Sequence, residues 1–262
     1  MADPTSTRAP SGATGVLVLE SGEVIWGRGF GAEGAAVGEV CFNTAMTGYQ
    51  EVMTDPSYAG QIINFTFPHI GNVGTNAEDI EATNPHALGC IVREDVTNPS
   101  NFRSSQDFVQ WMTVNGRIGI SGIDTRALTR LIREKGAPNA VIAHNAKGQF
   151  DIAALLTQAK ACPGLEGMDL AKTVSTTQSY GWSDGLWTLN QGYAANSANP
   201  NGPRVVAIDY GIKRNILRNL IDAGAQVTVV PATASFEDVM AHSPDGLFLS
   251  NGPGDPAATG VY

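Results

Sequence analysis

The sequence has little cysteine, few charged residues and no long apolar run. Its three cysteines stand far apart without a Cys-x-x-Cys pair, which disfavours a zinc site and favours a reducing compartment, the cytoplasm. The four histidines show no ligand spacing, so we expect no metal in this chain. No apolar stretch approaches the roughly 18 residues that span a membrane, and the N-terminus lacks the apolar centre of a signal peptide.

Positive charge is also scarce. Sixteen Lys and Arg face 25 Asp and Glu, a formal net charge of −9, which argues against nucleic acid or an anionic membrane as the main partner. No Gly-x-Gly-x-x-Gly follows the apolar run Arg204–Asp209, and no Gly-x-x-x-x-Gly-Lys occurs, so a dinucleotide or P-loop site is disfavoured. With 42% apolar and 16% charged residues, the chain is predicted to be globular.

The C-terminal part is predicted to form a parallel α/β sheet. Apolar runs at Arg204–Asp209, Gln226–Val230 and Gly246–Ser250 are separated by helix patterns at Ile212–Ala223 and Ser235–His242. Continuous apolar strands separated by helices are typical of a parallel sheet covered on both faces.

The loop Ser250–Pro256, with the sequence Ser-Asn-Gly-Pro-Gly-Asp-Pro, is the most informative motif. Gly252 and Gly254 lack Cβ, so the backbone can approach a ligand and aim N–H groups at an oxygen that becomes negative during acyl transfer. A rigid surface turn is the alternative. Because ligands bind beyond the carboxyl ends of parallel strands, we expect this loop and Asp209–Gly211 to form a site.

The N-terminal part is predicted to open as a sheet. Val16–Leu19 and Glu23–Trp26 suit a hairpin, and Gly38–Asn43 is a third strand. Loops rich in Gly, Pro, Asn and Thr follow between Thr44 and Thr75, as is typical of functional or packed segments.

Two helices are predicted further on. Ser104 begins the first, with Asp107 in the capping-box position, and Asp124 caps the second, Thr125–Lys135. Three arginines share the polar face of the second helix: Arg126, Arg130 and Arg133. A solvated basic face is the favoured interpretation, and a docking surface is the alternative.

None of the cysteines has the sequence context of a nucleophile. Cys41 and Cys90 lie in apolar strand patterns and are predicted to be core residues. Cys162 precedes Pro163-Gly164 in a predicted exposed turn.

The chain divides by composition into four parts. Residues 1–15 are predicted to be a flexible tail and residues 16–160 a first domain. Residues 161–203 form a connecting segment that ends in the turn-rich linker Asn190–Pro203, and residues 204–262 form a second domain.

Six collinear motifs resemble the small, glutamine-hydrolysing subunit of carbamoyl phosphate synthetase. They are Phe42–Glu51, Thr54–Tyr58, Pro68–Asn76, Ile123–Arg130, Asp209–Ile216 and Ser250–Pro256. The resemblance runs from about Val16 to the end of the sequence. The last two motifs alone would indicate only a class I glutamine amidotransferase.

The resemblance implies an α/β protein: an N-terminal β/β/α-type domain, then the first βαβαβ part of a class I amidotransferase parallel-sheet domain. Members of this family hydrolyse glutamine to glutamate and ammonia with a Cys-His-Glu set. They send the ammonia through a tunnel to a large synthetase subunit, which uses bicarbonate, ATP and Mg, for arginine and pyrimidine synthesis. The implied partners of this chain are L-glutamine and that large subunit, and the chain itself is expected to bind no cofactor.

Carried over to this sequence, the resemblance implies that Ser57, Gly252 and Gly254 contact glutamine, with Gly252 in the oxyanion hole. The nucleophilic cysteine is expected some tens of residues beyond Gly254, so no catalytic residue is predicted in this chain, and a truncated amidotransferase domain is favoured. The alternative function is a non-catalytic docking module for the large subunit. An amidotransferase of another pathway would leave residues 16–161 unexplained.

Overall fold

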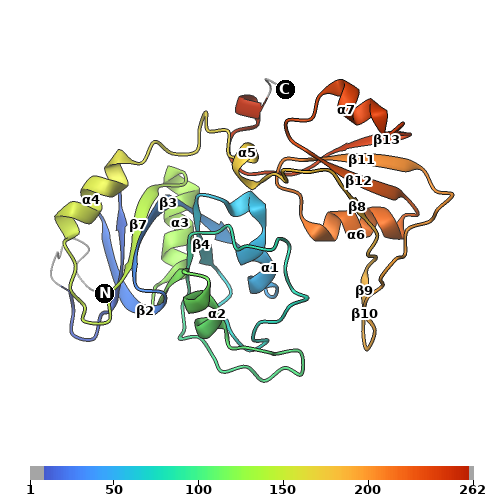
Figure 1. Ribbon diagram of the computed structural model, residues 1–262. Helices are drawn as coiled ribbons and strands as arrows, with labels where there is room; N and C mark the ends of the chain where they lie inside the picture. The colour runs from blue at the N-terminus through green and yellow to red at the C-terminus, as the bar shows by residue number, and fades with distance from the viewer. Residues whose placement is uncertain (1–8, 260–262) are drawn as a thin grey trace. The chain divides into compact units, whose positions relative to one another are not determined.

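The structure is a computed structural model that describes residues 9–259 (Figure 1). Its contacts divide it into two compact units, and the boundary in the C-terminal half lies between Leu165 and Glu166. Two short segments of the N-terminal half, Asp55–Ala59 and Ile80–Thr83, belong to the second unit. The second unit therefore draws on both halves of the sequence.

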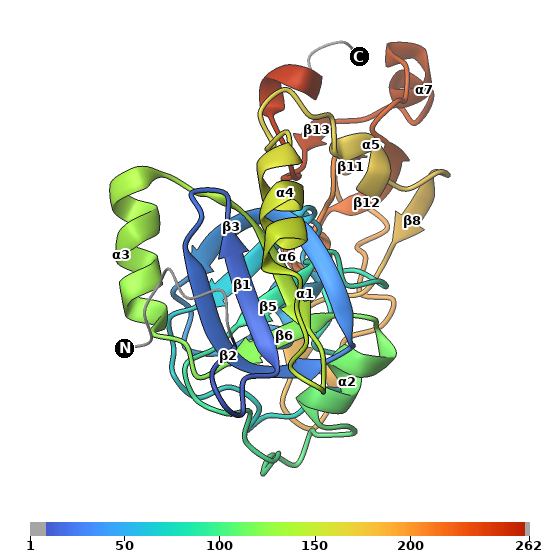
Figure 2. The ribbon, with the colours of Figure 1, turned by 90° about the vertical axis from the view of Figure 1, so that its left-hand side faces the viewer.

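The first unit contains a closed barrel of seven strands (Figure 2). In ring order the strands are β1 (Gly15–Leu19), β2 (Val24–Gly31), β6 (Ile118–Ser121), β5 (Gly89–Ile91), β4 (Gln61–Phe65), β3 (Gly34–Asn43) and β7 (Asn139–His144). The predicted hairpin is confirmed, because β1 and β2 pair antiparallel. Closure of the barrel was not predicted, since it depends on pairings between strands that are distant in sequence, such as β1 with β7.

Apolar side chains pack against both faces of β1, which explains the continuous apolar sequence of this strand. On β1, Leu17 joins a buried cluster that includes residues of α3 (Thr125–Lys135). Val16 points to the other face, in a cluster with α4 (Ile152–Ala161). Every residue of β1 is buried, because each face of the strand packs against apolar side chains.

One predicted helix start is wrong. The helix α2 (Phe108–Val114) begins after Asp107, whose carboxylate accepts the Gln110 N–H at 2.8 Å, and not at Ser104. The residues just before it are instead bonded to a distant loop: the Ser105 N–H donates to the Thr75 carbonyl at 2.9 Å, and Gln106 forms an isolated antiparallel bridge with Thr75. The second helix, α3, begins after Asp124 and ends at Gly136 with φ +91°, as predicted.

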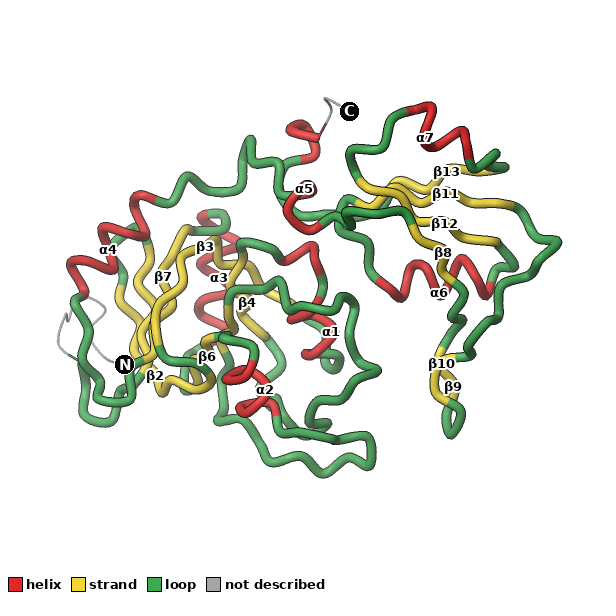
Figure 3. Tube along the Cα trace, viewed as in Figure 1, coloured by secondary structure: helices red, strands yellow, loops and turns green. Residues whose placement is uncertain are grey.

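Long loops occupy much of the first unit between Phe65 and Phe108 (Figure 3). Apart from β5, the residues of this stretch that belong to the first unit form neither helix nor strand. The short helix α1 (Tyr49–Thr54) precedes these loops. The predicted tail falls partly outside the described residues, which begin at residue 9, and Gly15 already belongs to β1.

The second unit is built on a mixed sheet in the order β13-β11-β12-β8. The predicted parallel arrangement is confirmed, because β11 (Arg204–Asp209) pairs parallel with both β12 (Gln226–Pro231) and β13 (Gly246–Leu249). The helices α6 (Arg214–Asp222) and α7 (Phe236–Ala241) lie on opposite faces of this sheet (Figure 1). Ala207 packs in the cluster that contains α6 residues, and its neighbour Val206 packs in the cluster that contains Val239 of α7.

Two features of the second unit differ from the prediction, and a third, at the edge of its sheet, is the exposed apolar surface expected of a truncated domain. The connecting segment supplies a fourth strand, β8 (Tyr180–Trp182), antiparallel to β12. A small hairpin of β9 (Trp187–Thr188) and β10 (Gly192–Tyr193) overlaps the predicted linker. Leu247 and Leu249 of β13 are 55% and 65% exposed, because among the described residues β13 pairs only with β11 and lies at the sheet edge.

The remaining elements of the second unit are short: η1 (Pro56–Tyr58), α5 (Ala171–Val174) and η2 (Pro256–Thr259). Among the helices of residues 9–259, none is long and apolar enough to cross a membrane.

Candidate functional site

The carboxyl end of β11 forms a rigid turn around Asp209. Its Oδ1 accepts the N–H groups of Gly211 at 2.9 Å and Ile212 at 2.8 Å, and its Oδ2 accepts the Thr176 N–H at 2.7 Å. The residue is only 5% exposed. These three charge-assisted hydrogen bonds hold the backbone of Tyr210 and Gly211 in place beyond the strand.

The loop Ser250–Pro256 begins at the carboxyl end of the neighbouring strand, β13. The Ser250 hydroxyl accepts the Tyr210 N–H at 2.9 Å and donates to the Asn251 carbonyl at 2.7 Å. The two segments that the sequence predicted to meet beyond parallel strands are therefore bonded to each other.

Asn251 joins this loop to Ser57, which lies almost two hundred residues earlier in the chain. The Asn251 Nδ2 donates to the Ser57 Oγ at 2.7 Å and to the Gly211 carbonyl at 3.0 Å. All of these residues belong to the second unit. A single amide side chain thus connects the serine, the Asp209 turn and the glycine loop.

The turn that carries Ser57 is itself held by polar bonds. The Asp55 Oδ1 accepts the Ser57 N–H at 2.9 Å, and the Asp55 Oδ2 lies 3.2 Å from the Lys213 Nζ. Asp55 is 6% exposed, and a buried carboxylate is stable only when paired or hydrogen-bonded. Lys213 therefore stabilises the turn that presents the Ser57 hydroxyl.

Both glycines of the loop are required by their surroundings. A Cβ on Gly252 would collide with the Tyr210 carbonyl oxygen, and a Cβ on Gly254, which has φ +81°, would lie 2.5 Å from the Met168 carbonyl oxygen. Among residues 9–259, no hydrogen bond from the N–H of Gly252 or Gly254 is found. The loop therefore approaches its neighbours closely while these two donors remain available to a ligand.

Asp255 closes the loop. Its carboxylate accepts the Ala257 N–H at 2.9 Å and the Gly167 N–H at 3.0 Å. These hydrogen bonds, the one from Ala257 first, lower the pKa of the Asp255 carboxyl. The carboxylate is therefore charged at neutral pH and ties the loop to the segment that precedes α5.

A cavity of about 390 Å³ lies against the loop. Its walls are Ala171, Tyr210, Thr259 and the loop residues from Ser250 to Gly254 together with Pro256. This volume falls at the lower end of the range of about 300–1,000 Å³ for small-molecule sites.

The three cysteines all lie in the first unit. Cys90 is fully buried, which raises the pKa of its thiol, and burial, with a smaller effect from the Glu39 carboxylate, raises the pKa of Cys41 to about 12. Cys162, predicted to be in an exposed turn, is half-buried at the end of α4. The second unit has no cysteine. No thiol of that unit can therefore lie beside the loop Ser250–Pro256.

The sequence predicted some of the residues of this site but not all of the side chains that connect them. Ser57, Gly252 and Gly254 were singled out, whereas Asn251 and Lys213 were not. Each follows an apolar strand by a few residues, but only the fold shows which of the many such polar residues meet. Among residues 9–259, no group of three His, Cys, Asp or Glu side chains is arranged to hold a metal ion.

The chain matches two protein-family models. Residues 17–142 match the CPSase domain of the carbamoyl-phosphate synthase small chain, and residues 206–261 match the class-I glutamine amidotransferase. The second match contains the Asp209 turn and the glycine loop.

Curated proteins that are similar to this chain are described as carbamoyl phosphate synthase small chains. The carbamoyl phosphate synthase small chain of Zymomonas mobilis subsp. mobilis is 69% identical over 246 residues, covering 94% of this chain and 66% of that protein. The carbamoyl phosphate synthase small chain of Ruegeria pomeroyi is 58% identical over 249 residues, covering 95% of this chain and 64% of that protein. The chain thus spans slightly less than two thirds of the length of these relatives.

Among solved structures, an aminopeptidase from Aneurinibacillus sp. strain AM-1 aligns with a TM-score of 0.30 and 11% identity, covering 92% of this chain and 57% of that one. A likeness this weak carries no argument about fold or function.

Proposed function

The chain belongs to the family of carbamoyl-phosphate synthase small chains, and from this premise we propose that it forms part of a subunit that hydrolyses glutamine. The products are glutamate and ammonia, and the ammonia passes to a large synthase chain that makes carbamoyl phosphate with ATP and Mg. We place this reaction in the cytoplasm and at the start of arginine and pyrimidine synthesis. The chain itself supplies glutamine-binding groups.

One observation carries the proposal: the Asn251 amide bonds the Ser57 hydroxyl at 2.7 Å beside the glycine loop and its cavity. The two parts of the sequence that the resemblance associates with glutamine are thereby brought together. In the proposed role, the Ser57 hydroxyl binds a polar group of the amino acid, and the loop surrounds the amide that reacts.

The chemistry proposed for the loop is stabilisation of an oxyanion. When a thiolate attacks the amide carbon of glutamine, the carbonyl oxygen becomes negative, and we assign the N–H of Gly252 as a donor to it. Collapse of this intermediate releases ammonia and leaves a thioester that water hydrolyses. Since the second unit contains no cysteine, we assign the thiol to the part of the relatives' length that this chain does not span.

The match of residues 17–142 to the CPSase domain of the small chain also supports a second candidate function. In this alternative the chain is a docking module that binds the large chain without hydrolysing glutamine. The two functions differ in one measurable property, because only a glutamine-hydrolysing subunit would lose activity when its glutamine-binding groups are changed.

The test compares nitrogen sources in a complex of the complete small chain with its large chain. Ser57→Ala should raise the KM for glutamine several-fold and leave carbamoyl phosphate synthesis from free ammonia unchanged. Ser179→Ala, which changes an exposed serine of the same unit, is the matched control. An unchanged KM for glutamine in the Ser57 variant would refute the assignment of this hydroxyl.

A further inference from the structure

The helix α6 begins at a residue that does not cap it. Within residues 9–259, the N-cap residue Lys213 makes no side-chain hydrogen bond to the start of the helix. The first N–H groups of a helix have no partner inside the helix, and a capping oxygen stabilises the helix by accepting one of them. A cap for α6 therefore has to come from another part of the chain.

Glu81 supplies this cap from the segment Ile80–Thr83, which lies in the N-terminal half of the sequence and belongs to the second unit. Its Oε2 accepts the Asn215 N–H at 2.8 Å, and its backbone carbonyl accepts the Arg214 N–H at 3.1 Å. The Thr83 Oγ1 accepts a further bond from the Arg214 guanidinium at 2.8 Å. A carboxylate at this place also complements the positive end of the helix dipole. The segment thus fixes where α6 begins.

Lys213, the residue just before this capped turn, is connected to both of the groups that hold Ser57. Its Nζ lies 3.2 Å from the Asp55 Oδ2, and the other oxygen of Asp55 accepts the Ser57 N–H at 2.9 Å. The Lys213 N–H also makes a long hydrogen bond of 3.5 Å to the Asn251 Oδ1, and the amide of Asn251 donates to the Ser57 Oγ at 2.7 Å. A shift of the helix start would therefore move both supports of the Ser57 hydroxyl.

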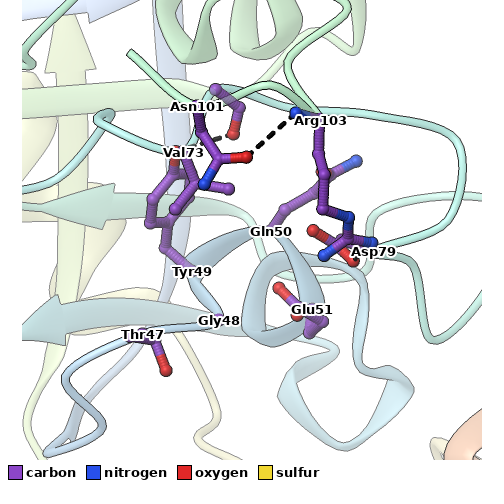
Figure 4. Close-up of a pocket in the computed structure, with 10 residues that line it drawn as sticks. Thr47, Gly48, Tyr49, Gln50, Glu51, Val73, Asp79, Asn101 and Arg103 are labelled. Carbon is purple, nitrogen blue, oxygen red and sulfur yellow. Dashed lines mark hydrogen bonds and ion pairs between the residues drawn. The ribbon is translucent and has the colours of Figure 1, made fainter. Parts of the chain in front are cut away.

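The capping segment follows directly on Asp79, a residue that charged and polar partners hold within the first unit. Asp79 is 8% exposed, and its Oδ1 lies 2.5 Å from the Arg103 guanidinium beside a cavity of about 240 Å³ (Figure 4). Its Oδ2 accepts the Asn76 Nδ2 at 2.9 Å. Because the chain that enters the segment is already ordered, less conformational entropy is lost when Glu81 binds the helix start.

We infer that Glu81 is a positioning residue of the proposed glutamine site: by capping α6 it fixes Lys213, and through Lys213 it fixes the two groups that present the Ser57 hydroxyl. This inference rests on the proposed function for the role of Ser57 in binding glutamine. Glu81 acts through these residues and not on the reacting atoms, so its loss weakens glutamine binding and leaves the chemical step unchanged.

The test measures glutamine kinetics in the complex of the complete small chain with its large chain. Glu81→Ala should raise the KM for glutamine about two- to tenfold, because a displaced hydroxyl loses up to one hydrogen bond to the substrate. The kcat and the synthesis from free ammonia should not change. Glu81→Gln keeps a side-chain oxygen that can accept the Asn215 N–H, and it should restore most of the original KM. An equal rise in both variants would contradict the capping role.

Ser235→Ala is the matched control, because it removes the cap of another helix in the same unit. The Ser235 Oγ accepts the Asp238 N–H at 3.1 Å at the start of α7. Both Ser235→Ala and Glu81→Ala should destabilise the second unit to a similar extent, as hydrogen exchange in β11 and β12 would measure. Only Glu81→Ala should raise the KM, since a general loss of stability would act in both variants.

A double variant tests whether Glu81 acts through Ser57. Adding Glu81→Ala to Ser57→Ala should raise the KM no further, because the hydroxyl that Glu81 positions is already gone; effects that multiply would contradict the inference. If Glu81→Ala does not assemble with the large chain, Thr83→Val gives the same test. It removes only the bond to the Arg214 guanidinium and should produce a smaller rise in KM.

The outcomes separate this inference from the function on which it rests. A raised KM in Ser57→Ala with an unchanged KM in the Glu81 and Thr83 variants would refute the positioning role and leave the proposed function standing. A rise in Ser235→Ala equal to that in Glu81→Ala would also refute it. An unchanged KM in Ser57→Ala would remove the role of Ser57 on which the inference depends.

Discussion

Replacing Asn251 with alanine should destabilise the second unit and uncouple Ser57 from the glycine loop. The substitution removes two donated hydrogen bonds, at 2.7 Å to the Ser57 Oγ and at 3.0 Å to the Gly211 carbonyl. At a net value of about 0.5–1.5 kcal/mol for each bond, the free energy of unfolding should fall by about 1–3 kcal/mol. Ser57→Ala removes only the first bond and should cost about 0.5–1.5 kcal/mol.

The double variant provides the sharper measurement. Because the two single variants share one bond, the loss in the double variant should be smaller than the sum of the single losses by about 0.5–1.5 kcal/mol. Hydrogen exchange followed by mass spectrometry suits this test, since peptides from β11 and β12 report on the second unit and peptides from β1 and β7 report on the first. Exchange in the first unit should not change.

Asn219→Ala is the matched control, because within residues 9–259 the Asn219 side-chain amide bonds only the carbonyl of Asn215 in its own helix, in an exposed position, and alanine is the better helix former. It should not destabilise the second unit. If the losses of Ser57→Ala and Asn251→Ala were additive within about 0.3 kcal/mol, the bond between these two side chains would not exist in solution and the argument for a shared site would fail.

Other predictions concern the chain as a whole. The 262-residue chain should release no ammonia from glutamine above background, because acyl transfer needs a thiolate beside the oxyanion donors; activity that disappears on mutating one of its cysteines would contradict this. A thiol reagent at pH 8 should label Cys162 faster than the half-buried Cys41 or the buried Cys90 in the folded chain, since a raised pKa lowers the thiolate fraction of Cys41 and Cys90, and urea should abolish the difference. A fragment of residues 16–160 should fold on its own and bind the large chain, and a fragment that shows no cooperative unfolding by circular dichroism would disprove the first part.

Predictions from the sequence were correct where the interaction joins residues close together in the chain, and they failed where it joins distant segments. The capping box of Ser235 and Asp238 and the cap of α3 by Asp124 were predicted correctly, because each depends on residues within one turn. The start at Ser104 was wrong, because a loop some thirty residues away competes for that backbone. Local signals identify a helix end only where no distant segment offers other hydrogen bonds.

The same distinction applies to the candidate site. The positions of Gly252 and Gly254 could be interpreted from the loop alone, because conformational freedom is a local property of glycine. The meeting of Asn251 with Ser57 and of Lys213 with Asp55 could not, since each pair joins segments more than one hundred and fifty residues apart. Only the fold specifies which polar side chains become partners.

The most direct test of the central claim is the effect of Gly252→Ala on carbamoyl phosphate synthesis by the complete small chain in complex with its large chain. The added Cβ would collide with the Tyr210 carbonyl and displace the Gly252 N–H. Glutamine-dependent kcat should then fall about 10²–10³-fold, as for the loss of an oxyanion donor, with ammonia-dependent synthesis unchanged. Gly246→Ala, where a Cβ meets nothing within 4 Å, should behave as the unmodified protein. An equal loss with both nitrogen sources, or a change in the KM for glutamine without a change in kcat, would contradict the role assigned to this loop.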